Sequence, residues 1–252
     1  MTELDTCWHS LVAREIKAPD GSVVVSAYRD ARITYPVYKA VKREHALSFF
    51  RSGSLRVGTL YDFRREEHAS GIADAQEGMH SSTGAHDGVI FQASVQARDG
   101  YIFSVSEDCD TNRFNGAGYD AVYRIDSPLF FDEIAKVLAK QMMMFPPMIA
   151  KVIYEEPAAI NEDISRRLTA GSSEEEALPP TAFLKRPSEA YQREVRFYME
   201  PQVDPIIGLY PDPAEHNVDS ILAAYRSIKS TLLPVTLKVP DARRYASKVR
   251  SR

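Results

Sequence analysis

The sequence predicts a strand-rich α+β fold. Short runs rich in β-branched and aromatic residues are separated by turn residues, and helical periodicity appears between them without a regular βαβ alternation. The chain has 252 residues, of which 44% are hydrophobic and 26% charged, a balance typical of globular proteins that bury a core without disulfides. We expect residues 1–252 to form a single domain, with a core at about 35–200 and peripheral additions at 1–34 and 201–252.

Charge and apolar content exclude several classes of protein. A net charge of −4 and a pI of about 5.9 argue against a protein that coats nucleic acid, although a local basic patch is compatible with them. The N-terminus lacks a basic head followed by a long apolar run, so no signal peptide is predicted. The apolar run at 142–150 contains two prolines and is too short to span a bilayer. We expect a cytoplasmic protein with no membrane contact.

The two cysteines, Cys7 and Cys109, lie far apart and form no CxxC pattern. A disulfide framework is therefore not expected, and two reduced thiols are.

The first third of the chain predicts strand, helix, strand. Residues 22–30 follow a Pro-Asp-Gly turn and predict a strand, and residues 35–41 predict a second one. Residues 43–53 predict a short helix with Gly53 as its C-cap. Residues 54–64 then predict a strand and a turn. The apolar stripe of the helix consists of Ala46, Leu47, Phe49 and Phe50.

Residues 65–88 are polar, rich in glycine and long enough to predict a functional or mobile loop. The titratable residues of this loop are Glu66, Glu67, His68, Asp74, Glu77, His80, His86 and Asp87. The spacing of these residues fits no compact set of metal ligands, so no metal site is predicted.

The middle of the chain predicts a hairpin. Residues 88–96 and 101–108 are strand-like and are joined by Asp-Gly, a hairpin signal. A polar turn follows, in which Asn115, Gly116 and Gly118 permit close approach of a ligand. An ordinary strand–turn–strand connection explains this turn equally well.

Residues 120–126 predict a strand, and residues 127–143 predict an amphipathic helix with Ser127 as its N-cap. Residues 150–156 predict a strand, residues 159–171 a helix, and residues 172–181 a solvated linker.

The C-terminal part predicts a helix at 219–230 and a last strand at 234–240. The basic tail, residues 241–252, predicts a frayed end or a surface helix rather than a nucleic-acid arm.

The stretch YQREVRFYME, residues 191–200, alternates like a strand. Its apolar face holds Tyr191, Val195, Phe197 and Met199. Its polar face holds Gln192, Glu194, Arg196 and Tyr198. Either that polar face is an ordinary solvated face with a Glu–Arg pair, or it faces a site. The chain has no Walker loop, GxGxxG, GxSxG or HExxH motif.

Four pieces taken in order resemble one family. They are VYK with Tyr38 and Lys39 followed by GSLRVGTLYDF, then Asp74-x-x-Glu77, then the pair Phe103–Ser104 in IFSVSED, then a lysine-bearing loop leading to YQREVR. This order resembles a little-characterised bacterial branch of the ADP-ribosyltransferase superfamily. Several of its relatives act as toxins or phage-defence effectors. The resemblance covers residues 35–200 and rests on pattern order rather than on a long identical string.

The resemblance implies a split-sheet ADP-ribosyltransferase-like fold with peripheral helices and an NAD cleft. It places the late catalytic glutamate on Glu194 and the middle serine on Ser104. The early Arg or His position falls on Lys39 or its neighbour Tyr38, a departure from the family pattern. Gln192, two residues before the glutamate, goes in that family with targets other than arginine.

The resemblance also implies a role for each residue. Glu194 would stabilise the cationic ribose, Ser104 would brace Glu194 or the nicotinamide amide, and Gln192 would orient the acceptor. Lys39 would hold the diphosphate or a ribose hydroxyl, and Tyr38 or Tyr61 would stack on the nicotinamide ring. Arg196 would keep Glu194 ionised, and the loop at 65–88 would act as a lid. The predicted cofactor-binding residues are Lys39, Tyr38, Tyr61, Phe103 and Arg196.

Three hypotheses follow. The first is an enzyme that transfers ADP-ribose from NAD to a protein or nucleic-acid acceptor, or hydrolyses NAD. Such an enzyme would act as a toxin or phage-defence effector and could have an antitoxin partner. The second is a non-catalytic module on the same fold that binds a nucleotide or a partner. The third is a metal- or acid-dependent nuclease that uses the Asp74–Glu77 loop.

Overall fold

The computed structural model confirms a mixed fold with few helices and a strand-rich antiparallel sheet. Among the described residues, no helix is both long enough and apolar enough to cross a membrane. The described residues are 10–12, 15–17, 23–25, 29–31, 35–64, 79–86, 89–96, 98–110, 118–145, 147–154, 181–203, 205–207 and 229–249.

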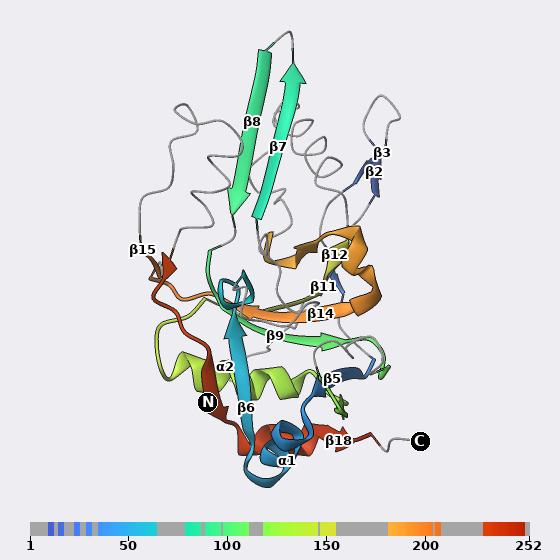
Figure 1. The fold of residues 1–252 in the computed structure, drawn as a ribbon, viewed down its shortest axis with the longest axis vertical. Coiled ribbons are helices and arrows are strands. Elements are labelled where there is room, and N and C mark those ends of the chain that lie inside the picture. Colours follow the sequence, from blue (N-terminus) through green and yellow to red (C-terminus); the bar gives the residue numbers. More distant parts are fainter. Residues whose placement is uncertain are drawn as a thin grey trace.

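The main sheet has eight antiparallel strands (Figure 1). Six of them follow one another in the order β11 (Met148–Lys151), β14 (Glu194–Met199), β9 (Tyr101–Ser106), β5 (Val37–Val41), β10 (Ala121–Ile125) and β18 (Ala246–Lys248). The other two, β6 (Ser54–Thr59) and β17 (Val235–Lys238), pair with each other, and β6 also pairs with β9.

The sheet splits at β9. One end of this strand pairs with β5, where Tyr38 lies opposite Ser106. The other end pairs with β6, where Gly58 lies opposite Ile102. Neither branch pairs with residues 103–105 on that edge. Ser104, in the middle of this gap, therefore lies between the two branches.

One face of the sheet carries the main core. Alternate residues of β9 and β14 point to it, as the period of a strand requires. The helices α1 (Arg43–Ser52) and α2 (Leu129–Ala139) and the 3₁₀ helix η6 (Pro240–Tyr245) pack on this face. Buried residues of this core include Phe49, Tyr101, Phe103, Val105, Tyr123, Phe130, Phe131, Ile134, Leu138, Val195, Phe197 and Met199.

The ends of the two helices follow the predicted capping with one difference. Gly53 ends α1 at φ 70°, and its N–H donates to the Phe49 carbonyl at 2.7 Å, which confirms the predicted C-cap. Pro128 is the N-cap of α2, one residue later than predicted, although the Ser127 hydroxyl still accepts the Leu129 N–H at 3.3 Å.

The opposite face of the sheet changes character along β9 and β14. At one end Ile102 and Tyr198 pack in a small apolar cluster with Leu60, Tyr61 and Phe183. At the other end this face carries Ser104, Ser106, Glu194 and Arg196, which lie opposite one another in the register of β9 and β14.

The predicted hairpin between residues 88–96 and 101–108 is wrong. Strand β8 (Val89–Gln96) pairs with β7 (Met79–His86), and this long hairpin extends away from the sheet in Figure 1. The Asp99 carboxylate instead accepts the N–H groups of Tyr61 and Gly100, each at 3.0 Å. This ties the Asp-Gly segment to the end of β6. The predicted loop thus contains a strand, while Asp74 and Glu77 lie outside the described residues.

Residues 229–249 contribute to the core rather than to a peripheral addition. Besides β17, η6 and β18, they supply the buried side chains of Leu232, Leu237, Val239 and Ala242. In the basic tail a helix is confirmed only as the short 3₁₀ helix η6, and a strand, β18, follows it. Residues Lys229–Ser230 form β16 and pair with β15 (Ile206–Ile207), where the end of a helix was predicted.

The other described elements are short. Strands β2 (Glu15–Lys17) and β3 (Val23–Val25) form a hairpin, and β1 (Ser10–Val12) pairs with β4 (Arg29–Ala31). β12 (Ile153–Tyr154) pairs in parallel with β13 (Leu184–Lys185). Three more 3₁₀ helices are η1 (Asp62–Arg64), η3 (Thr181–Phe183) and η4 (Pro187–Gln192).

The single strands predicted at 22–30 and 150–156 are thus each divided in two. The predicted helix at 159–171 lies outside the described residues.

Candidate functional site

The start of β14 differs from the predicted strand. Residues up to Gln192 belong to η4, and Arg193 has a left-handed φ of 44° before β14 begins at Glu194. Tyr191, predicted on the core face, is 42% exposed, whereas Gln192 is 5% exposed. From Glu194 onward the alternation is as predicted, because Val195, Phe197 and Met199 pack in the core.

Glu194 lies inside a buried ion cluster. Its Oε1 accepts a hydrogen bond from Arg196 Nε at 2.6 Å, and its Oε2 accepts one from Arg196 Nη2 at 3.3 Å. Lys185 Nζ lies 3.1 Å from Oε2. Glu194 is 6% exposed and Arg196 is 1% exposed. Both carboxylate oxygens are thus occupied by cations that solvent screens little.

The pKa of Glu194 is held well below its ordinary value. Burial raises this pKa, but the charges of Arg196 and Lys185 and hydrogen bonds from Arg196 and Ser104 together outweigh burial. Glu194 is therefore a carboxylate at neutral pH. The predicted role of Arg196 in keeping Glu194 ionised matches this geometry.

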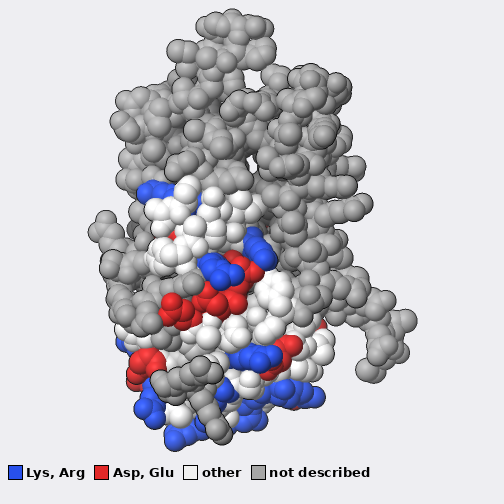
Figure 2. All heavy atoms as spheres, turned by 90° about the vertical axis from the view of Figure 1, so that its right-hand side faces the viewer, with Lys and Arg blue, Asp and Glu red and all other residues white. Residues whose placement is uncertain are grey.

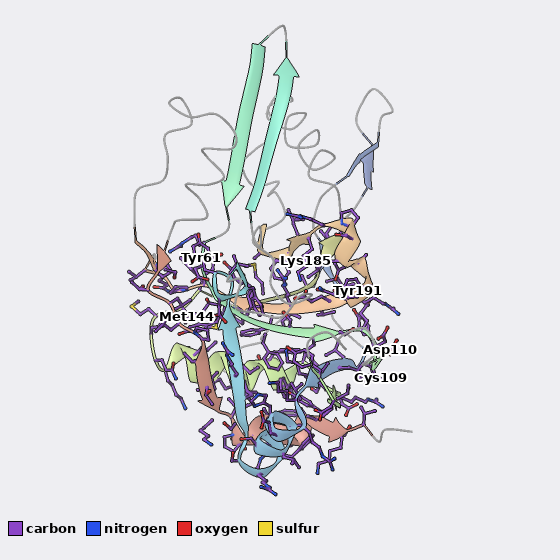
Figure 3. All side chains as sticks on the ribbon, viewed as in Figure 1. Tyr61, Cys109, Asp110, Met144, Lys185 and Tyr191 are labelled. Atoms are coloured by element: carbon purple, nitrogen blue, oxygen red, sulfur yellow. The ribbon has the colours of Figure 1, made fainter. Side chains whose placement is uncertain are left out.

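Two further residues hold the cluster. Lys185 is the lysine of the loop before YQREVR that the resemblance included, whereas the sequence did not single out Tyr154. Lys185 Nζ donates to Gln192 Oε1 at 2.8 Å and lies 3.1 Å from Glu189 Oε2, so it joins Gln192 to Glu194. The Tyr154 hydroxyl accepts the Glu194 N–H at 2.8 Å. Figure 3 places Lys185 and Tyr191 in the same part of the molecule. The sequence pointed to the loop of Lys185 but not to its contact with Gln192, seven positions later, because that contact depends on the turn of η4.

Lys39 reaches into the split from β5. Its Nζ donates to the Ser104 main-chain oxygen at 2.6 Å and lies 4.6 Å from the centre of the Phe103 ring. Burial lowers the pKa of Lys39 to about 8, and the nearby charge of Glu194 offsets part of that effect. Lys39 thus fills the hydrogen-bonding position that a strand would take beside Ser104.

A cleft of about 450 Å³ opens at the split. This volume is typical of sites for small molecules and cofactors. Lys39, Phe103 and Ser104 form part of its wall. Other wall residues include Lys42, His45, Phe49, Arg56, Gly58, Asp62, Phe63, Ile102, Tyr119 and Tyr123.

Basic side chains outnumber acidic ones in this wall. Lys39, Lys42 and Arg56 carry positive charge, and Asp62 carries the one negative charge among the described wall residues. Arg56 Nη2 lies 3.1 Å from Asp62 Oδ2, while the Arg56 side chain is 62% exposed. The cleft therefore favours an anionic ligand.

The predicted site residues fall into three groups. Lys39, Phe103 and Ser104 line the cleft. Glu194 and Arg196 lie behind Ser104, which hydrogen-bonds Glu194 and faces Arg196 across the two strands. Gln192 joins this second group through Lys185.

The third group consists of the two predicted stacking tyrosines, which do not line the cleft. Tyr38 is half-buried beside Ser106, at the β5 edge of the split. Tyr61 is buried against Ile102 and Tyr198. Glu194 pairs with Ser106, at the other end of β9 from Ile102. In Figure 3, Tyr61 and Cys109 lie on opposite sides of the molecule.

A network of charges lies where β9 ends and β14 begins. Arg193 Nη1 lies 3.1 Å from Asp108 Oδ2, and Lys151 Nζ lies 2.5 Å from Glu107 Oε1. Figure 2 shows acidic and basic side chains gathered on this side of the molecule. These contacts hold Arg193, whose backbone is left-handed, next to the buried cluster.

No group of three or more His, Cys, Asp or Glu side chains suited to a metal ion occurs within the described ranges. Cys109 is an exposed free thiol. Comparison of the chain with family models, curated proteins and solved structures gives no match. Membership of the ADP-ribosyltransferase superfamily stays a prediction.

Proposed function

We propose that the protein binds NAD in the cleft at the split and cleaves its nicotinamide–ribose bond, with ADP-ribose passing to a protein or nucleic-acid acceptor or to water. One observation carries the proposal. Ser104 lines the cleft, and its main-chain oxygen accepts a hydrogen bond from Lys39. Its side chain hydrogen-bonds Glu194. A cation for the ligand and a carboxylate for the reaction therefore meet at one residue.

The charges of the cleft support the binding of a diphosphate. Lys39 and Arg56 would hold the phosphate oxygens. The Lys39 ammonium does not form an ion pair with any described carboxylate, so an anionic ligand would meet a cation with no such partner.

The chemistry assigned to Glu194 is electrostatic. As the bond between nicotinamide and C1 of the ribose breaks, nicotinamide leaves with the bonding electrons and the sugar becomes cationic. A carboxylate next to the sugar stabilises that charge. The acceptor then forms a bond to C1 and loses its proton to solvent. Glu194 has the required ionisation, since its pKa lies well below the ordinary range.

The second candidate is a module that binds a nucleotide without cleaving it. The occupation of both Glu194 oxygens by Arg196 and Lys185 favours this function. So does the depth of Glu194, which is 6% exposed behind Ser104. Both functions share the same NAD cleft and differ in whether Glu194 reaches the sugar.

Release of nicotinamide from NAD separates the two functions. Glu194→Gln alone would leave two buried cations without their carboxylate, a change that costs about 3–5 kcal/mol and could unfold the chain. The test therefore uses Glu194→Gln combined with Lys185→Met. Lys185→Met alone is the matched control, and NAD binding is measured for every variant.

If the protein cleaves NAD, the wild type and Lys185→Met should both release nicotinamide. The double variant should still bind NAD but no longer release nicotinamide. NAD binding without release by any variant supports the binding module. Release that persists in the folded double variant contradicts the role of Glu194. Toxicity on expression in a bacterial host, relieved by the double variant, would support the toxin or phage-defence role.

A further inference from the structure

The half-buried Lys39 side chain differs from the buried side chain of Lys185. Lys185 contacts the carboxylates of Glu189 and Glu194. Lys39 instead donates to the Ser104 carbonyl at 2.6 Å and lies 4.6 Å from the centre of the Phe103 ring, with no ion pair among the described residues. A lysine amine without a carboxylate partner in a partly apolar pocket is the environment that makes lysine nucleophilic.

The amine is also within reach of a ligand, because Lys39 lines the cleft of about 450 Å³. Burial lowers its pKa from 10.5 to about 8, so a larger fraction of Lys39 is neutral near neutral pH than for an ordinary lysine. The neutral amine can donate a hydrogen bond to the Ser104 oxygen and keep its lone pair free. That hydrogen bond holds the nitrogen at a defined position in the split.

We propose that Lys39 is a covalent capture site for an aldehyde or ketone that carries a phosphate group. The lysine supplies the nucleophile, and Lys42 and Arg56 line the same cleft and supply positive charge for the phosphate. This inference is independent of NAD cleavage, since it requires neither Glu194 nor the breaking of the nicotinamide–ribose bond.

The reaction balances without an oxidant or a further reactant. The neutral Lys39 nitrogen attacks the carbonyl carbon, and a C–N bond forms as the carbonyl electrons move to oxygen. Both nitrogen protons pass to the oxygen, the C–O bond breaks to release one water molecule, and the nitrogen lone pair forms the second C–N bond of an imine. Hydrolysis reverses the reaction and restores the lysine.

Pyridoxal 5′-phosphate and borohydride trapping test this proposal on the intact wild-type chain. The probe carries both an aldehyde and a phosphate, and the reductant fixes any imine as a stable secondary amine. Peptide mapping by mass spectrometry then measures the labelling of each lysine. Pyridoxal, which lacks the phosphate, is the matched probe, and the exposed Lys140 at the end of α2 is the internal reference.

Lys39 should be labelled at lower probe concentrations than Lys140. Loss of the phosphate should weaken labelling of Lys39 about tenfold, the equivalent of one charge-assisted contact. Arg56→Gln should reduce the preference for the phosphate while pyridoxal still labels Lys39. Labelling of Lys39 no stronger than that of Lys140, or equal labelling by the two probes, would overturn the proposal.

Discussion

The Lys39 ammonium donates a hydrogen bond of 2.6 Å to the main-chain oxygen of Ser104, at the point where the sheet splits. β5 and β6 both pair with β9 but leave residues 103–105 without a strand partner on that edge. A buried carbonyl without a hydrogen bond would destabilise the fold. Lys39 satisfies that carbonyl and places a basic group in the wall of the cleft.

Replacing Lys39 with methionine should change how stability depends on pH. Burial lowers the pKa of Lys39 from 10.5 to about 8. Between those pH values the unfolded chain binds a proton that the folded chain has released, so stability rises with pH. Over this pH range the free energy of unfolding of the wild type should therefore rise by up to about 3 kcal/mol relative to that of Lys39→Met, and by less because Lys39 is partly exposed. Urea unfolding of both proteins at pH 7.5 and pH 10 measures this change. A difference between the two proteins that is the same at both pH values would contradict the lowered pKa of Lys39.

The buried pair of Glu194 and Arg196 should show strong coupling. Arg196→Met should lower the free energy of unfolding by about 3–5 kcal/mol, because it removes the cation that contacts both oxygens of Glu194. The double variant with Glu194→Gln should cost less than the sum of the two single variants. A cycle of urea unfolding measurements gives the coupling, and simple additivity would show that the pair does not act as a unit.

Acid should remove the contribution of Glu194 to stability. Its folded-state pKa lies below the ordinary value of 4.5, because Arg196, Lys185 and two hydrogen bonds outweigh burial. This stabilisation is present above about pH 4.5 and is lost as the pH falls toward the folded-state value. The difference in unfolding free energy between the wild type and Glu194→Gln should therefore shrink below pH 4.5. A difference that stays constant down to pH 3 would contradict this account.

Alanine substitutions at two glycines with similar φ values should distinguish the cost of backbone strain from the cost of a steric clash. Gly53 and Gly118 have φ values of 70° and 68°. A Cβ at Gly53 would lie 2.5 Å from the Pro240 Cα, whereas a Cβ at Gly118 would meet nothing within 4 Å. Gly118→Ala should cost about 1–2 kcal/mol of backbone strain. Gly53→Ala should cost clearly more, because η6 must move away from α1. Equal losses of thermal stability would contradict the close approach of Pro240.

Local patterns predicted a good part of this fold. Gly53 was identifiable as a C-cap because a left-handed position after an apolar helical stripe strongly favours glycine. The alternation from Glu194 to Met199 was readable because a two-residue period assigns each side chain to a face. The same alternation placed Glu194 and Arg196 together on a polar face.

Long-range contacts decide what the sequence left open. Asp99-Gly100 has the pattern of a hairpin, yet the Asp99 carboxylate caps the turn after β6, which lies 38 positions away from it. Lys185 joins the cluster through the η4 turn. Arg193 has a left-handed φ, which residues other than glycine rarely adopt. No spacing rule predicts such contacts, because they depend on how distant segments pack.

The central claim is that the cleft at the split is an NAD site in which Lys39 contacts the ligand. Isothermal titration of NAD into the wild type, Lys39→Met and the control Lys140→Met tests it most directly. Loss of one charge-assisted contact should weaken binding by about 10- to 150-fold in Lys39→Met and leave Lys140→Met unchanged. Absence of NAD binding by the folded wild type, or equal affinity in a folded Lys39→Met, would contradict the claim.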